Sequence, residues 1–84
     1  MKKVDTRVAL IAIIVEELES IEKLNALLHQ YREYVIGRMG VPYKAKNISI
    51  ISVAVDAPAD TISALSGKLG MLKGISTKTI YSKV

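Results

Sequence analysis

The sequence predicts an α+β sandwich in which two helices cover one face of a four-stranded antiparallel sheet. Residues 8–15 (VALIAIIV) and 48–55 (ISIISVAV) are apolar on both of the faces that a strand presents, which is typical of central strands covered on both sides. Residues 21–35 and 59–72 instead repeat their apolar side chains at helical spacing. The alternation of these patterns along the chain predicts the sandwich.

The first helix is expected to begin at Ser20 and to run to about Glu33. Serine is a preferred N-cap residue, and Glu22 lies where a negative charge stabilises a helix N-terminus. The second helix is expected to begin at Pro58, which suits a first helical turn, and to end near Gly70. The apolar positions of the two helices are Ile21, Leu24, Leu28, Tyr31 and Val35, and Ile62, Leu65, Leu69 and Leu72.

Two weaker strands complete the predicted sheet. Residues 34–41 form the second, although Gly37 and Gly40 interrupt it, and residues 42–47 are polar enough for a turn. Residues 75–82 (ISTKTIYS) have the composition of a last strand. The resulting order, β-α-β-β-α-β, predicts a ferredoxin-like sandwich that occupies residues 1–84 as a single domain.

In this fold the two apolar stretches form the central pair of strands. One set of alternating side chains should pack under the helices: Ile11, Ile13, Val15, Ile51, Val53 and Val55. The other set should lie on the open face: Val8, Leu10, Ala12, Ile14, Ile48, Ile50, Ser52 and Ala54. Soluble monomers rarely expose such a patch, so we expect the open face to join copies of the chain in a homodimer or homotetramer.

The amino-acid composition limits the reactions and the cellular locations that are compatible with the chain. The chain has no cysteine, which removes disulfides and thiolate chemistry and is compatible with a reducing compartment. The net charge of +4 comes from scattered Lys and Arg residues. The first apolar stretch is too short to span a bilayer and ends in Glu16 and Glu17 without a cleavage site. We expect a cytoplasmic protein that does not associate with membranes.

Several functions of the ferredoxin-like fold are disfavoured. The loop at residues 16–19 (EELE) would repel phosphate, and the central strands lack the aromatic residues on which RNA bases stack. Nucleic-acid binding through Lys44, Lys46 and Arg38 is a weaker alternative. The sequence shows no pair of carboxylates and no nucleophile with a base at a spacing that would indicate catalysis. We therefore predict no enzymatic activity and no cofactor.

Two motifs have simple structural interpretations. His29 is expected on the polar side of the first helix as a solvated residue, and a weak metal site shared between subunits is the less favoured alternative, so no metal is predicted. Gly67 and Lys68 lack the other residues of a phosphate-binding loop. A glycine within a helix is costly, so we expect another element to approach Gly67 closely.

The segment 37–43 (GRMGVPY) is the most distinctive in the chain. It predicts either a bulged edge strand or a ligand site in which Arg38, Gly40 and Tyr43 meet at a subunit interface. Since a guanidinium binds carboxylates and phosphates, the ligand would be a small anionic effector.

At this segment the chain resembles the family of small iron-only hydrogenase system regulators. The resemblance extends over segments 4–7, 37–43, 48–53, 62–70 and 78–83 and so over essentially the whole chain. It implies an ACT-like ferredoxin fold, similar to the C-terminal domain of nickel-responsive repressors, with homo-oligomeric assembly and a regulatory link to iron-only hydrogenase systems. We therefore expect a non-enzymatic regulatory or sensor domain. An oligomeric adaptor that binds another protein without a ligand is the alternative.

Overall fold

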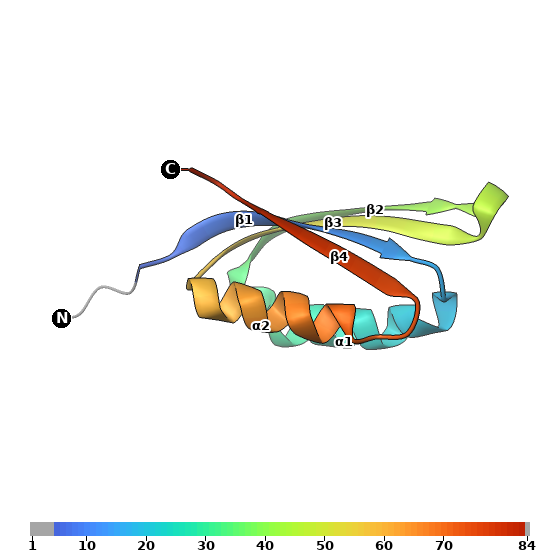
Figure 1. Cartoon of the computed structure of the whole chain (residues 1–84), viewed down its shortest axis with the longest axis horizontal. Helices are drawn as coiled ribbons and strands as arrows, with labels where there is room; N and C mark the ends of the chain where they lie inside the picture. The colour runs from blue at the N-terminus through green and yellow to red at the C-terminus, as the bar shows by residue number, and fades with distance from the viewer. Residues whose placement is uncertain (1–4, 84) are drawn as a thin grey trace.

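The computed structural model describes residues 5–83 and has two layers, a four-stranded sheet and a pair of helices beneath it (Figure 1). The strands and helices, in chain order, are β1 (Arg7–Val15), α1 (Ile21–Gln30), β2 (Val35–Tyr43), β3 (Ile48–Ala57), α2 (Ala59–Gly70) and β4 (Ile75–Tyr81). Short 3-10 turns at Leu18–Ser20, Arg32–Tyr34 and Lys44–Lys46 join some of them.

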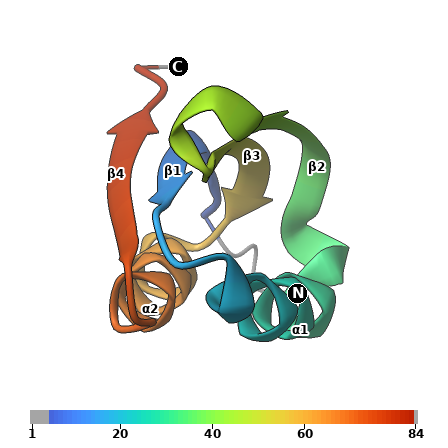
Figure 2. The same cartoon turned by 90° about the vertical axis from the view of Figure 1, so that its right-hand side faces the viewer.

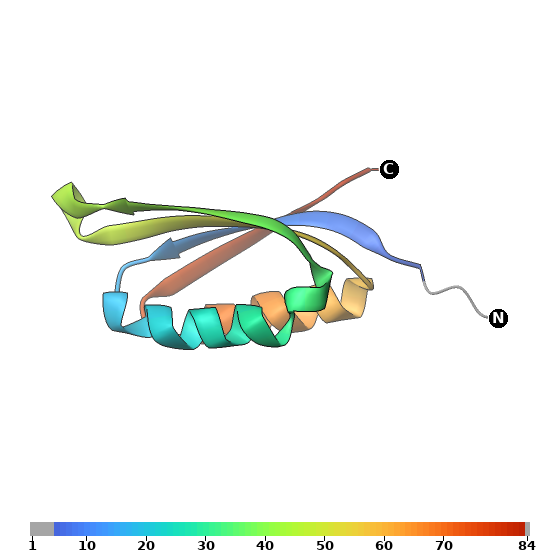
Figure 3. The same ribbon diagram turned by 180° about the vertical axis from the view of Figure 1, so that it is seen from behind.

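The sheet is antiparallel throughout, with the strand order β2-β3-β1-β4. Viewed end-on, α1 lies on the side of β2 and α2 on the side of β4 (Figure 2). The predicted ferredoxin-like, ACT-like architecture is thereby confirmed. The hairpin of β2 and β3 extends past the ends of the helices (Figure 3).

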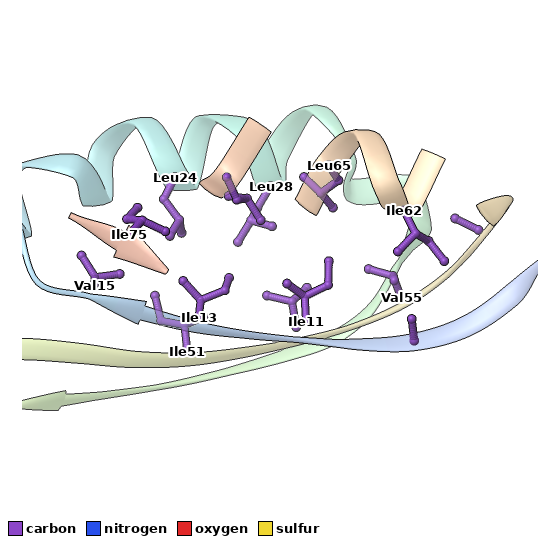
Figure 4. Close-up of a cluster of buried hydrophobic side chains, with 14 residues drawn as sticks. Ile11, Ile13, Val15, Leu24, Leu28, Ile51, Val55, Ile62, Leu65 and Ile75 are labelled. Atoms are coloured by element: carbon purple, nitrogen blue, oxygen red, sulfur yellow. The ribbon is translucent and has the colours of Figure 1, made fainter. Parts of the chain in front are cut away.

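The core lies between the sheet and the helices (Figure 4). All six side chains that were predicted to pack under the helices are buried. Leu24 and Leu28 from α1 and Leu65 and Leu69 from α2 pack against them from the helix layer. Burial of one such side chain is worth about 1.5–3 kcal/mol, and this layer is the main source of stability in the isolated chain.

The prediction that the first helix runs to Glu33 was wrong by one turn. The helix ends at Gln30, and a 3-10 turn at Arg32–Tyr34 follows. The Tyr34 amide donates to the Tyr31 carbonyl at 2.9 Å in this turn, while both tyrosines pack against the core. Tertiary packing of the two rings therefore takes precedence over a longer helix.

The second strand is longer than predicted, because it continues through Pro42 to Tyr43. A proline lacks the amide that a ladder requires, but β2 is an edge strand, where one side of the backbone needs no partner. The register with β3 shifts between Val35 and Gly37, which confirms the bulged edge strand. Val35 at the start of this bulge and Arg38 just after it line a hollow that is described below.

Ser20 stands at the N-cap position of α1 but does not cap the helix with its side chain. Its hydroxyl instead donates to the Lys73 carbonyl at 2.7 Å, and the Glu16 amide donates to the Gly74 carbonyl at 2.7 Å. Gly74 has a φ of 71°, and a Cβ there would lie 2.8 Å from the Glu17 amide nitrogen. The two connections at this end of the sandwich are thus fastened to each other.

Gly67 does not have the close neighbour that was expected. A Cβ placed there would meet nothing within 4 Å, so the position faces open space. The structure shows no packing reason for this glycine.

Candidate functional site

The face of the sheet opposite the helices is apolar. All eight residues predicted for the open face lie on it. They alternate along β1 and β3 with the side chains that are buried under the helices. Val8, Leu10, Ile14 and Ile50 are each about 40% exposed, from 38% to 42%. Ile48, Ser52 and Ala54 are half-buried by their neighbours on the sheet.

The apolar surface is wider than the sequence predicted. The register places Met39, Val41 and Tyr43 of β2 opposite Ser52, Ile50 and Ile48, and Ile80 of β4 opposite Leu10. The four added side chains are between 47% and 68% exposed. The alternation of apolar residues at 39, 41 and 43 was the signal that could have identified β2 as part of this face. We call the combined set the open face: Val8, Leu10, Ala12, Ile14, Met39, Val41, Tyr43, Ile48, Ile50, Ser52, Ala54 and Ile80.

Charged side chains lie only at the margins of the open face within the described residues. Lys78 projects from the edge strand β4 opposite Ala12, and Asp56 lies opposite Val8 at one end. Two shallow hollows, of about 260 and 240 Å³, flank Leu10. One of them lies over Gly37, which contributes no side chain. The centre of the face therefore offers both projections and depressions, and Arg38 is the one charged residue among those described that borders these two hollows.

Arg38 lies on the other side of β2, toward the helices. It lines a hollow of about 320 Å³ between β2 and α1 together with Asn25, Leu28, His29, Arg32 and Val35. The Arg38 Nη2 donates to Asn25 Oδ1 at 3.0 Å, and the Arg32 Nη1 donates to the His29 carbonyl at 2.9 Å. We call this feature the α1–β2 hollow.

The three residues predicted to bind a ligand do not line one hollow. Gly40 faces the core, where a Cβ would lie 3.7 Å from Ile51 Cγ1. Tyr43, the last residue of β2, lines a separate hollow with Leu18 and Lys44 near the tip of the hairpin. Asn25 and Arg32, which do accompany Arg38, were not singled out in the sequence because they come from a different element and turn.

The structure also shows where the remaining residues considered in the sequence analysis lie. His29 is exposed near the end of α1, as expected for a solvated residue, and it also borders the α1–β2 hollow. Residues 5–83 contain no group of three His, Cys, Asp or Glu side chains that could hold a metal ion. Within the described part of the chain, no helix is long and apolar enough to cross a membrane. Lys68 Nζ donates to the Tyr31 hydroxyl at 3.0 Å.

Comparison with solved structures finds chains of similar fold. The chain is similar to the uncharacterized protein TM1266 from Thermotoga maritima, with 35% identity and a TM-score of 0.90 over 94% of this chain and 100% of that one. It also resembles a formyltetrahydrofolate deformylase from Pseudomonas putida KT2440, with 19% identity and a TM-score of 0.57 over 89% of this chain. The chain spans only 28% of the deformylase, and this likeness concerns the fold alone.

A comparison with curated proteins finds no relative of this chain. A family model does match, over residues 7–79, and its description is "Iron-only hydrogenase system regulator, putative". The match covers all four strands except the last residues of β4, and it agrees with the full-length similarity to TM1266. The chain belongs to the TM1266-like family that this model describes.

Proposed function

We propose that this chain is a non-enzymatic regulator that acts as a homo-oligomer joined through the open face of its sheet. The observation that carries the proposal is the apolar surface that extends over β1, β2 and β3 and reaches Ile80 of β4, with Lys78 and Asp56 at its margins among the described residues. Apolar patches of this extent on soluble proteins usually mark interaction sites. Membership of a family described as a regulator supports the regulatory role.

The size of the open face suits a dimer. Strands lie ~4.8 Å apart and rise ~3.3 Å per residue, so four strands over about seven residues cover roughly 440 Å² in projection. The accessible area exceeds the projected area because the side chains form relief. Stable interfaces bury roughly 600–1,000 Å² on each partner, and the relief of this surface brings it toward the lower end of that range.

A second copy of the chain is the occupant that fits best. The centre of the open face has no charge pattern that would select an acidic or a basic partner. It has a projecting Leu10 next to hollows that can receive a side chain of similar size. Such a surface can pair with itself about a two-fold axis. Its regulatory effect would follow from the assembly, which an effector or a hydrogenase-system protein would bind in preference to the free chain.

Light scattering over a concentration series tests the assembly. The wild-type chain should have at least twice the 9.2 kDa mass of one copy at micromolar concentration. Ile50→Lys should weaken association by roughly 100-fold or more, because it buries an unpaired ammonium group in the interface. Ile50 is 41% exposed in the single chain, so the lysine can reach water in a monomer and the fold should survive.

Ser63→Lys is the matched control, since it adds the same charge to the exposed surface of α2. It should leave the assembly unchanged. If Ile50→Lys unfolds, Met39→Lys provides the same test at a position that is 68% exposed. A wild-type chain that remains a monomer would overturn the proposed assembly. A stable complex with another protein on this face would favour the adaptor role instead.

Complementation of a deletion strain tests the regulatory role in a host that has an iron-only hydrogenase. Loss of the gene should change hydrogenase activity or abundance, and both wild type and Ser63→Lys should restore it. Ile50→Lys should fail to restore it while accumulating to a normal level. Equal hydrogenase activity and abundance with and without the gene would contradict the regulatory proposal.

A further inference from the structure

Two arginines border the α1–β2 hollow without a carboxylate partner. Arg38 bonds the neutral amide oxygen of Asn25, and Arg32 bonds the main-chain oxygen of His29. Neither guanidinium forms an ion pair with another described residue. Each guanidinium has five N–H donors, of which these contacts use one, so most of the donors remain available for a ligand.

The hollow also has an apolar floor. Leu28 is only 4% exposed there, and Val35 is half-buried beside it. A volume of about 320 Å³ is at the lower end of the range for small-molecule sites. The combination of an apolar floor with two cations at the rim is suited to a small molecule that has an apolar part and an anionic group.

The opposing charges nearby are weaker. The C-terminal end of α1 carries about half a negative charge, but Arg32 already occupies the His29 carbonyl at that end. Glu33 borders a separate, smaller hollow of about 160 Å³ together with Gln30 and Arg32, and Glu22 lies one turn before Asn25 on α1. Neither carboxylate lines the α1–β2 hollow, where the local charge is positive.

We propose that the α1–β2 hollow is a binding site for a small organic oxyanion, with a carboxylate or phosphate group held between Arg38 and Arg32. Asn25 orients Arg38 by accepting one of its N–H groups, and a ring N–H of His29 is available as a further donor. Leu28 and Val35 contact the apolar part of the ligand. The site lies within one chain, on the opposite side of the sheet from the open face.

The inference rests on the proposed function in one respect, since it names the ligand class to which the regulator would respond. Successive residues of β2 serve the two surfaces, because Arg38 lies at the hollow and Met39 lies on the open face. A ligand that fixes β2 would therefore also affect the surface through which the copies pair. By linkage, assembly would change the affinity for the ligand by the same factor.

Titration of the intact protein with inorganic phosphate and with benzoate, followed by amide NMR spectra, tests the site. Phosphate lacks an apolar part and benzoate lacks phosphate, so the two arms separate the contribution of the anionic group from that of the floor. We expect saturable shifts in residues 25–38. Arg38→Gln and Arg32→Gln should each weaken binding about tenfold or more, because each loses a charge-assisted bond.

Lys46→Gln is the matched control, since it removes an equal charge at the tip of the hairpin, outside the residues that line the hollow. It should leave the affinity unchanged, and Arg38→Lys should give an intermediate affinity because it keeps the charge without the planar fork. Equal weakening by Arg38→Gln and Lys46→Gln, or no saturation with either anion, would overturn the site. Light scattering on the same samples separates the two proposals, because a dimer without a ligand refutes only the site and a monomer that binds refutes only the assembly.

Discussion

The two faces of the sheet differ in what covers them, although they are built from the same residue types. Ile13 and Ile14 are neighbours in β1, yet Ile13 is 1% exposed and Ile14 is 38% exposed. The helices account for the first value, and none of the described residues covers the Ile14 side chain to the same degree. The difference shows that hydrophobicity alone identifies a surface to be buried, while the topology determines whether the chain itself can bury it.

The largest expected effect separates the two faces by stability. Ile11→Ala should lower the free energy of unfolding by about 2–5 kcal/mol, because it leaves a cavity in a site that is 0% exposed. Leu10→Ala, at the next residue and 42% exposed, should cost the isolated fold about 1 kcal/mol or less and should instead weaken association. Urea denaturation at fixed protein concentration, together with light scattering, measures both. Similar losses of stability from the two substitutions would erase the distinction between the faces.

A smaller effect on stability is expected from substitutions of two glycines, Gly74 in the connection between α2 and β4 and Gly37 on the open face. Gly74→Ala should cost about 1–3 kcal/mol, since the residue has a φ of 71° and the added carbon would collide with Glu17. Gly37 lies at a hollow of the open face, where a Cβ meets nothing within 4 Å. Gly37→Ala should therefore leave the melting temperature unchanged or slightly higher. A Gly74→Ala protein as stable as wild type would show that the two connections can move apart freely.

The smallest effect concerns the margin of the open face. Lys78→Met should tighten association by roughly 3- to 10-fold, because it removes a cation that must keep its hydration beside the interface. Lys23→Met makes the same change on the exposed side of α1 and should have no effect on association. The dimer dissociation constant from sedimentation measures both. Weaker association of Lys78→Met would instead place this lysine in a favourable contact with the partner copy.

The fold could be predicted from the sequence because its signals are local and periodic. The two apolar stretches and the two helical repeats identify the central strands and the helices. Their order leaves few topologies open. The errors lie at boundaries where long-range contacts decide the outcome. Ser20 is the N-cap residue of α1 as predicted, but its hydroxyl donates to Lys73 rather than to its own helix. β2 continues through Pro42 because it lies at an edge.

The candidate site was less accessible to prediction. Arg38 was identified from its chemistry and its setting between glycines. Its companions Asn25 and Arg32 come from α1 and from the 3-10 turn after it, so only the packing of α1 beside β2 brings them together. Tyr43 was grouped with Arg38 by sequence proximity, but alternation along a strand turns the two residues to opposite faces.

The hydrogen bonds at the two ends of β1 affect the register in which this strand pairs with its neighbour. In most sheets a register shift of one residue would expose apolar side chains to water, and this free-energy cost fixes the register. Both faces of β1 carry apolar side chains, so a shift of one residue would exchange one apolar set for the other and would cost little free energy. The alignment must then come from polar clamps at the two ends. The Glu16 amide and the Ser20 hydroxyl hold one end through the carbonyls of Gly74 and Lys73, and the Val8 carbonyl holds the other by accepting from the Ser82 amide at 2.8 Å. If β4 paired with β1 one residue out of register, these groups would lose their partners, so these few hydrogen bonds favour the observed register of β1 with β4.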